Sequence, residues 1–156
     1  MFDMTRAITC AGAPARRTDR GMALILTYLT SLIVFLSFDA FWLGVAGGAF
    51  YRDVLGDLML NGFRVVPAMT FYLLQIAGIV TFVLPQERVR ANLWWAAAYG
   101  AFYGICTYGT YDLTNQATLR NWSSVLSVVD VAWGTTLAAT TSLITWLIVN
   151  RLLGAA

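Results

Sequence analysis

Three aspartates, Asp39, Asp112 and Asp130, are the residues of this chain most suited to chemistry. Each lies within or directly after a long apolar stretch. A carboxylate at the centre of a membrane helix costs about 2.5–3.5 kcal/mol to insert, so such acids usually face protein or water and often mark function. A close cluster of them could hold a proton, donate a hydrogen bond to a lipid headgroup, or bind a cation.

Aromatic and polar side chains accompany these acids. Trp42 follows Asp39 by three residues and Trp133 follows Asp130 by three, which places each pair on one helix face. We expect these indoles and Tyr111 to form the walls of a ligand pocket, and polar residues after Asp112 to supply directional hydrogen bonds. The expected pocket residues are Asp39, Trp42, Tyr111, Asp112, Asn115, Thr118, Asp130 and Trp133.

A purely structural interpretation of the same residues stays open. Tryptophan and tyrosine are enriched at membrane interfaces whatever the function. Asp112 and Asn115 could be residues of a helix end and turn. Asp39 and Asp130 could accept hydrogen bonds from indole N–H groups or from Arg120 and only fix the packing of helices.

The composition places the chain in a membrane. Of 156 residues, 59% are hydrophobic and 12% are charged, and the mean hydropathy is +0.68. A soluble domain carries roughly a quarter of its residues as charges. A soluble enzyme or a nucleic-acid-binding module is therefore excluded, and a net charge of +2 gives no basic field for a nucleic-acid partner. The length indicates one domain.

The residue types that bind metals and cofactors are scarce. Histidine is absent, which excludes a Ser–His–Asp triad, a haem held by histidine and a histidine-based zinc site. The two cysteines, Cys10 and Cys106, have no CxxC spacing. We expect no metal and no cofactor, and we expect Cys106 to be a small buried hydrophobic residue.

Four apolar runs are long enough to cross a bilayer, which takes about 20 residues. Because backbone amides in hydrocarbon must be satisfied within their own segment, continuous runs without alternation indicate helices. The sequence predicts an all-α bundle of four transmembrane helices. The spans are residues 22–43, 65–84, 93–111 and 125–149.

A short interfacial helix is expected after the first span. Tyr51, Val54, Leu55 and Leu58 have the spacing of one helix face, and the charged residues between them face away. Before the first span, residues 1–21 contain four arginines and few large apolar residues, which indicates a mobile cytoplasmic arm.

The arginines indicate the orientation. Seven of the ten lie in the arm, the 85–92 loop and the C-terminus, so both termini are expected in the cytoplasm. With this orientation Asp39 lies about 6 Å and Asp130 about 7–8 Å inside the outer end of its span. Asp112 directly follows the third span, so all three acids are expected in the outer half of the membrane.

Small residues indicate close helix packing. Gly100 and Gly104 form a GxxxG pattern in the third span, and Gly134, Ala138 and Ser142 form a similar stripe in the fourth. These stripes could meet within one chain. They could also join copies in a homo-oligomer or contact a larger membrane complex, and membrane lipids are the other expected partners.

Three motifs in order resemble a known family. They are Phe38-Asp39-Ala40-Phe41-Trp42-Leu43-Gly44, then Tyr111-Asp112-Leu113-Thr114-Asn115 with Ala117-Thr118-Leu119, then Asp130-x-x-Trp133-Gly134. The chain resembles, over about residues 22–150, the bacterial membrane proteins grouped as domain of unknown function 2177. The resemblance implies a multi-pass protein of the bacterial inner membrane, and it implies no activity, substrate or cofactor.

The favoured function is a non-catalytic accessory protein that binds a lipid or small ligand in an outer-leaflet polar pocket. Three alternatives stay open. A lipid-modifying enzyme could use a carboxylate as general base, although no nucleophile–base pair or metal set is visible. A small proton-coupled transporter would need a polar path through the inner half. A structural subunit of a larger complex would use the small-residue faces.

Overall fold

The structure, a computed structural model, describes residues 17–153, and these form helices joined by short turns and loops. The α-helices are α1 (Arg17–Trp42), α2 (Gly48–Leu55), α3 (Val65–Gly78), α4 (Glu87–Ala91), α5 (Leu93–Thr118) and α6 (Ser124–Leu153). No strand occurs within residues 17–153, so the all-α prediction is confirmed. Residues 1–16 of the expected arm lie outside the described residues, and residues 17–21 belong to α1.

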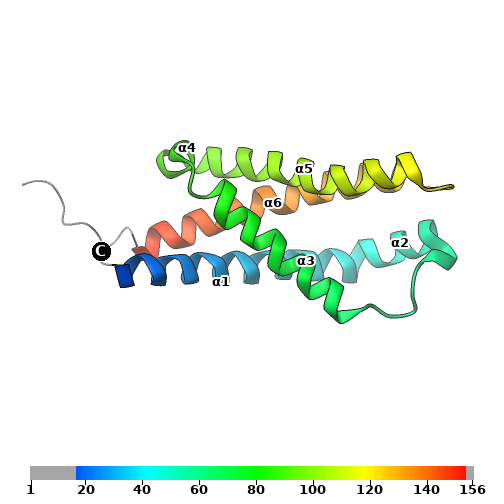
Figure 1. The fold of residues 1–156 in the computed structure, drawn as a ribbon, viewed down its shortest axis with the longest axis horizontal. Coiled ribbons are helices and arrows are strands. Elements are labelled where there is room, and N and C mark those ends of the chain that lie inside the picture. The colour runs from blue at the N-terminus through cyan, green and yellow to red at the C-terminus, as the bar shows by residue number, and fades with distance from the viewer. Residues whose placement is uncertain (1–16, 154–156) are drawn as a thin grey trace, which may run out of the picture.

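Two π-helical turns change how the first helices run. One, Leu43–Gly47, joins α1 to α2, and the other, Ile79–Val83, extends α3. Because the backbone stays helical between them, α1 and α2 form one continuous rod, with α2 at its far end (Figure 1). A helix is present where a short interfacial helix was expected, but it continues α1, its position in the interface stays a prediction, and its apolar face is shorter than predicted. Leu58 is 73% exposed because the α-helix ends at Leu55, before a turn in which Gly56 has a φ of 50°.

The helices pack as a layered bundle. Helices α5 and α6 lie side by side and antiparallel, α1 packs against α6, and α3 crosses the others obliquely (Figure 1). The buried hydrophobic cluster lies where α1, α3 with its π-helical turn, and α6 meet. It consists of Phe35, Ile76, Ile79, Val83, Leu137 and Ala138.

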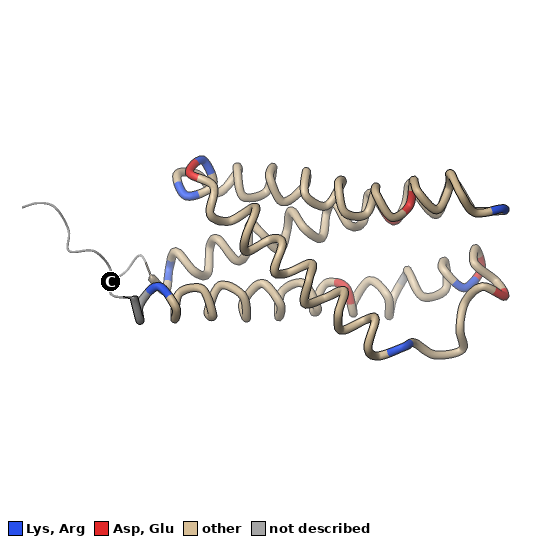
Figure 2. Tube along the Cα trace, in the orientation of Figure 1, with Lys and Arg blue, Asp and Glu red and all other residues tan. Residues whose placement is uncertain are grey.

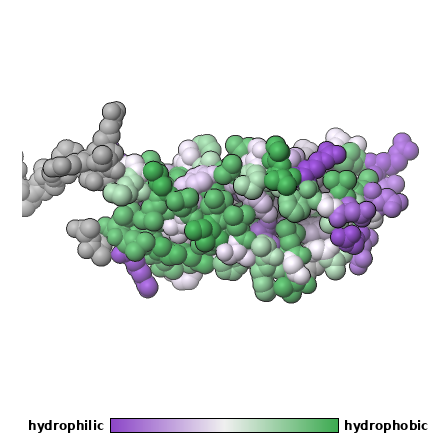
Figure 3. All heavy atoms as spheres, turned by 90° about the horizontal axis from the view of Figure 1, so that it is seen from below, coloured by the Kyte–Doolittle hydropathy of each residue, from purple (hydrophilic) through white to green (hydrophobic). Residues whose placement is uncertain are grey.

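Three described helical segments are long and apolar enough to cross a membrane. They are Arg20–Val45, Val65–Val83 and Ser124–Leu153, which correspond to three of the four predicted spans. Helix α5, which contains the predicted span 93–111, does not reach the same hydropathy because tyrosine, glycine and polar residues interrupt its apolar ones. The face seen in Figure 3 is hydrophobic over most of its length, with hydrophilic residues gathered at one end.

The GxxxG glycines of α5 face α6. A Cβ at Gly104 would lie 2.5 Å from the carbonyl oxygen of Gly134, and one at Gly100 would lie 2.6 Å from that of Ala138. The two small-residue stripes therefore meet within one chain and let the backbones approach closely. An oligomer or a larger complex stays a prediction.

Two features of the α3–α5 region were not predicted. The 85–92 loop contains α4, and the indole N–H of Trp146 in α6 donates to the carbonyl oxygen of Val89 at 2.6 Å. This bond fastens the loop to the bundle. The prediction that Cys106 is buried was wrong, because its side chain is exposed.

Candidate functional site

Asp39 joins three helices through its carboxylate. The side chain, from α1, is 8% exposed. The indole Nε1–H of Trp133 in α6 donates to Oδ1 at 3.1 Å, and the hydroxyl of Tyr72 in α3 donates to Oδ2 at 2.7 Å. Each carboxylate oxygen therefore has a donor from a different helix, which offsets the free energy of removing the charge from water.

Asp130 has a different set of neighbours. This half-buried residue of α6 accepts a hydrogen bond from the Tyr51 hydroxyl of α2, and the Trp42 indole donates to the same Tyr51 oxygen at 3.3 Å. Gly47 permits this arrangement, because a Cβ there would lie 2.6 Å from the Trp42 Nε1. The π-helical turn and its glycine thus position α2 over α6.

The two indoles connect these hydrogen-bonded groups. Trp42 and Trp133 stack with ring centroids 4.6 Å apart and an interplanar angle of 13°. Asp39, Asp130 and the aromatic side chains that bond to them therefore form one contiguous group. We name it the acid–aromatic cluster, and its members are Asp39, Trp42, Tyr51, Tyr72, Asp130 and Trp133.

Asp112 is the most deeply buried of the three acids. The sequence placed it just beyond a span ending at residue 111, but α5 continues to Thr118, so Asp112 lies inside the helix and is 0% exposed. Its carboxyl group lies beside Asp130 and Ser127 of α6. Neither of its oxygens makes a hydrogen bond of standard geometry with these neighbours or with any other group in the described part of the chain. The helix was predicted too short because tyrosine and polar residues end the apolar run before they end the helix.

The remaining expected pocket residues lie on other parts of α5. Asn115, one turn after Asp112, is half-buried. Tyr111 is 58% exposed and packs edge-on against Trp122, and the exposed Thr118 donates to the carbonyl of Thr114 in its own helix. Because residues 111 and 118 point about 100–120° away from residue 112 on a helix, the structure does not bring them into the cluster.

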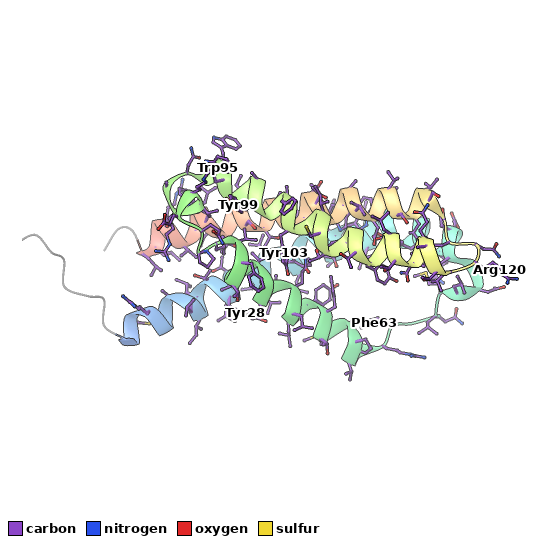
Figure 4. The ribbon with its side chains drawn as sticks, turned by 45° about the horizontal axis from the view of Figure 1, so that its top comes forward. Tyr28, Phe63, Trp95, Tyr99, Tyr103 and Arg120 are labelled. Carbon is purple, nitrogen blue, oxygen red and sulfur yellow. The ribbon has the colours of Figure 1, made fainter. Side chains whose placement is uncertain are left out.

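Arg120 does not neutralise the acids. It is exposed at the tip of the turn between α5 and α6 (Figure 4). Across the described residues, no group of three histidine, cysteine or acidic side chains is placed to hold a metal ion. Asp39 therefore relies on a tyrosine hydroxyl and an indole as donors, and Asp130 relies on a tyrosine hydroxyl.

Tyrosines of the cluster were not identified from the sequence as site residues. Tyr72 lies within an apolar run. Its hydroxyl could have indicated a polar partner, because a buried tyrosine usually donates its O–H to an acceptor. Burial and, secondarily, the hydrogen bond to Asp130 raise the pKa of Tyr51 above its ordinary value.

Two further tyrosines outside the cluster bind the backbone of α3 where this helix crosses the bundle. The hydroxyl of Tyr28 donates to the carbonyl oxygen of Leu73 at 3.0 Å, and that of Tyr103 donates to the carbonyl oxygen of Gln75 at 3.5 Å (Figure 4).

The long apolar helices indicate a multi-pass α-helical membrane protein, in which carboxylates are buried against aromatic hydrogen-bond donors. The chain belongs to the family described as predicted membrane protein (DUF2177), whose model matches residues 24–147. The resemblance inferred from the three motifs is thereby confirmed. No curated protein and no solved structure matches the chain. The family description establishes a membrane protein and assigns no activity.

Proposed function

We propose that this protein is a non-catalytic membrane protein that binds an amine-bearing lipid headgroup or small ligand at Asp112 and Asp130. The observation that carries the proposal is Asp112, which is fully buried beside Asp130 and Ser127 with neither carboxylate oxygen in a hydrogen bond of standard geometry. A buried acceptor without a donor is destabilised by about 1–3 kcal/mol, and more when it is charged. A protonated amine supplies both the donors and the opposite charge.

The surroundings of the two acids suit such a ligand. Asp39 has a donor on each oxygen, so it serves to orient Trp133 and Tyr72. Asp130 and Trp42 are only half-buried, which leaves a side from which a headgroup can approach. The indole faces of Trp42 and Trp133 that are not stacked on each other would also attract a cation, by about 0.5–2 kcal/mol.

We infer that α5 is a fourth span. Its 26 residues extend about 39 Å at 1.5 Å per residue, which exceeds the roughly 30 Å hydrocarbon core. It lies against α6 and runs between the same two ends of the bundle (Figure 1). A helix packed this way along a spanning helix crosses the membrane with it.

We further propose that the bundle lies in the bacterial inner membrane with both termini in the cytoplasm. The start of α1, the loop that contains α4 and the end of α6 gather at one end, and arginines mark all three (Figure 2). The positive-inside rule assigns that end to the cytoplasm. The acid–aromatic cluster then lies in the outer half.

Native mass spectrometry with bound lipids retained tests the ligand proposal. We expect the detergent-solubilised protein to retain phosphatidylethanolamine, which has a primary ammonium group, in preference to phosphatidylcholine. The Asp112→Asn/Asp130→Asn variant should retain at least about tenfold less, a loss of about 1.4 kcal/mol. The matched control is Asp53→Asn/Asp57→Asn, which removes two exposed acids of the α2 region. Equal retention by wild type and both variants would contradict the proposal.

Proton movement is a second candidate function. It is favoured by buried polar residues in the half of the bundle that does not contain the acid–aromatic cluster. Gln75 is buried in α3, and Thr141 and Ser142 are buried in α6 with unpartnered hydroxyl oxygens. Thr145, one turn further along, bonds to a serine of α1 at 3.1 Å. These groups extend a polar path away from the cluster. Proton flux into liposomes above background, reduced by Asp130→Asn, is the expected result, and flux at background would exclude this candidate.

A further inference from the structure

A cavity opens at the end of the bundle opposite the acid–aromatic cluster. Its volume is about 760 Å³, within the range of small-molecule and lipid sites. Residues of α1, of the segment from α3 to α4, and of α6 line it. Arg20, which lines it, precedes Asp39 by 19 residues of α1, or about 28 Å along the helix axis, so the cavity is separate from the cluster.

The charge of this cavity has one sign. Arg20 and Arg90 both line it, and both are exposed. Its lining residues, all of them within the described part of the chain, include no aspartate or glutamate. Two arginines that line one cavity suit a phosphate, which arginine recognises through paired N–H donors.

Much of the cavity wall is apolar, and one side of it is fixed. Leu24, Val80, Leu84 and Val149 line it, together with the polar residues Thr27, Thr145 and Asn150. The segment that carries Arg90 is held in place, because the indole of Trp146, another lining residue, donates to the backbone of α4. A cavity lined by two arginines and several apolar side chains matches a molecule with an anionic head and a hydrocarbon chain.

We propose that this cavity binds an anionic phospholipid, with the phosphate at Arg20 and Arg90 and an acyl chain along the apolar wall. Basic pockets between transmembrane helices on the cytoplasmic side bind anionic headgroups, and the cytoplasmic leaflet carries the negative surface potential that favours them. The choice of leaflet rests on the proposed orientation. The choice of ligand rests on the charge and shape of the cavity alone.

Lipid retention measured on the full chain tests this site separately from the outer one. In native mass spectrometry with equimolar phosphatidylglycerol and phosphatidylcholine, wild type should retain phosphatidylglycerol. Arg20→Gln/Arg90→Gln should reduce that retention about tenfold, while Arg52→Gln/Arg64→Gln, which removes two exposed arginines elsewhere, should leave it unchanged. Asp112→Asn/Asp130→Asn should also leave it unchanged, so the two binding proposals fail independently.

Two further arms identify the occupant. Leu24→Trp keeps both arginines but fills the apolar wall, so it should displace the phospholipid, whereas a site for free phosphate would be unaffected. Excess inorganic phosphate should not compete with the lipid. Equal retention of both lipids, no effect of the arginine variant, or full competition by inorganic phosphate would each overturn the proposal.

Discussion

At the residue scale, two hydrogen bonds to Asp39 stabilise its carboxylate and also hold α1, α3 and α6 together. Trp133→Phe and Tyr72→Phe each remove one donor and leave one carboxylate oxygen unpartnered. Each should lower the free energy of unfolding by about 1–3 kcal/mol, because a bond to a charged group is lost in a buried place. Reversible unfolding in mixed micelles measures the effect.

A control for these substitutions is Tyr111→Phe. Tyr111 is exposed and its hydroxyl makes no hydrogen bond in the described structure, so the change should stay within about 0.5 kcal/mol. If Trp133→Phe and Tyr72→Phe were as mild as the control, Asp39 would not depend on these donors.

The raised pKa of Tyr51 predicts how the stability of the folded protein changes at alkaline pH. Burial, with the hydrogen bond to Asp130, raises its pKa in the folded protein above the ordinary value of 10.0. Above about pH 10 the unfolded state therefore loses a proton that the folded state keeps, so the stability contributed by this group declines as pH rises and is complete at lower pH. Melting temperatures should fall less steeply from about pH 9 to 11 for Tyr51→Phe than for wild type. Parallel curves would show that Tyr51 titrates normally.

At the scale of elements, the contact between α5 and α6 depends on the absence of side chains. Gly104→Ala would place a Cβ 2.5 Å from the Gly134 carbonyl oxygen and 2.8 Å from the Thr135 Cα, so the helices must separate. We expect a loss of about 1–3 kcal/mol, as for other overpacked interfaces.

Gly109→Ala on the same helix is the matched control. No atom lies within 4 Å of a Cβ built there, so the substitution should be neutral or stabilise the helix by up to about 1 kcal/mol. Thermal unfolding of the two variants in one detergent compares them directly. Equal effects would show that α5 and α6 do not need close contact at residue 104.

The sequence predicted elements better than it predicted contacts. Apolar runs located three helices that are long and apolar enough to cross a membrane, because a bilayer imposes length and hydrophobicity on each helix separately. The same rule misjudged the end of α5, where helix continues through Asp112 and Asn115 because α6 covers one face. No sequence pattern predicted the π-helical turn at Leu43–Gly47, where the Trp42 side chain packs so closely against Gly47 that no Cβ would fit.

The candidate site was predictable in part for the same reason. Spacing of three residues paired Asp39 with Trp42 and Asp130 with Trp133 on their own helices. That each aspartate would bond aromatic groups of other helices, Tyr72 and Tyr51, depends on how the helices pack. Single-helix periodicity does not contain that information.

At the scale of the whole molecule, the bundle has two different ends. One carries the arginine-lined cavity, and the other carries the acids, so the two proposed ligands have opposite charges. A membrane with anionic lipid on its cytoplasmic side favours one orientation of such a molecule. The four-span topology and this orientation can be tested together.

Cysteine labelling distinguishes the topologies. In a Cys10→Ser/Cys106→Ser background, single cysteines at exposed positions report on each end: Asp57→Cys in the α2–α3 segment, Glu87→Cys in α4 and Arg120→Cys after α5. A membrane-impermeant maleimide added to intact spheroplasts should label positions 57 and 120, and position 87 should react only after permeabilisation. If α5 did not cross the membrane, positions 87 and 120 would label from the same side. If the bundle had the opposite orientation, position 87 alone would react in intact cells, and the arginine-lined cavity would then face the outer leaflet.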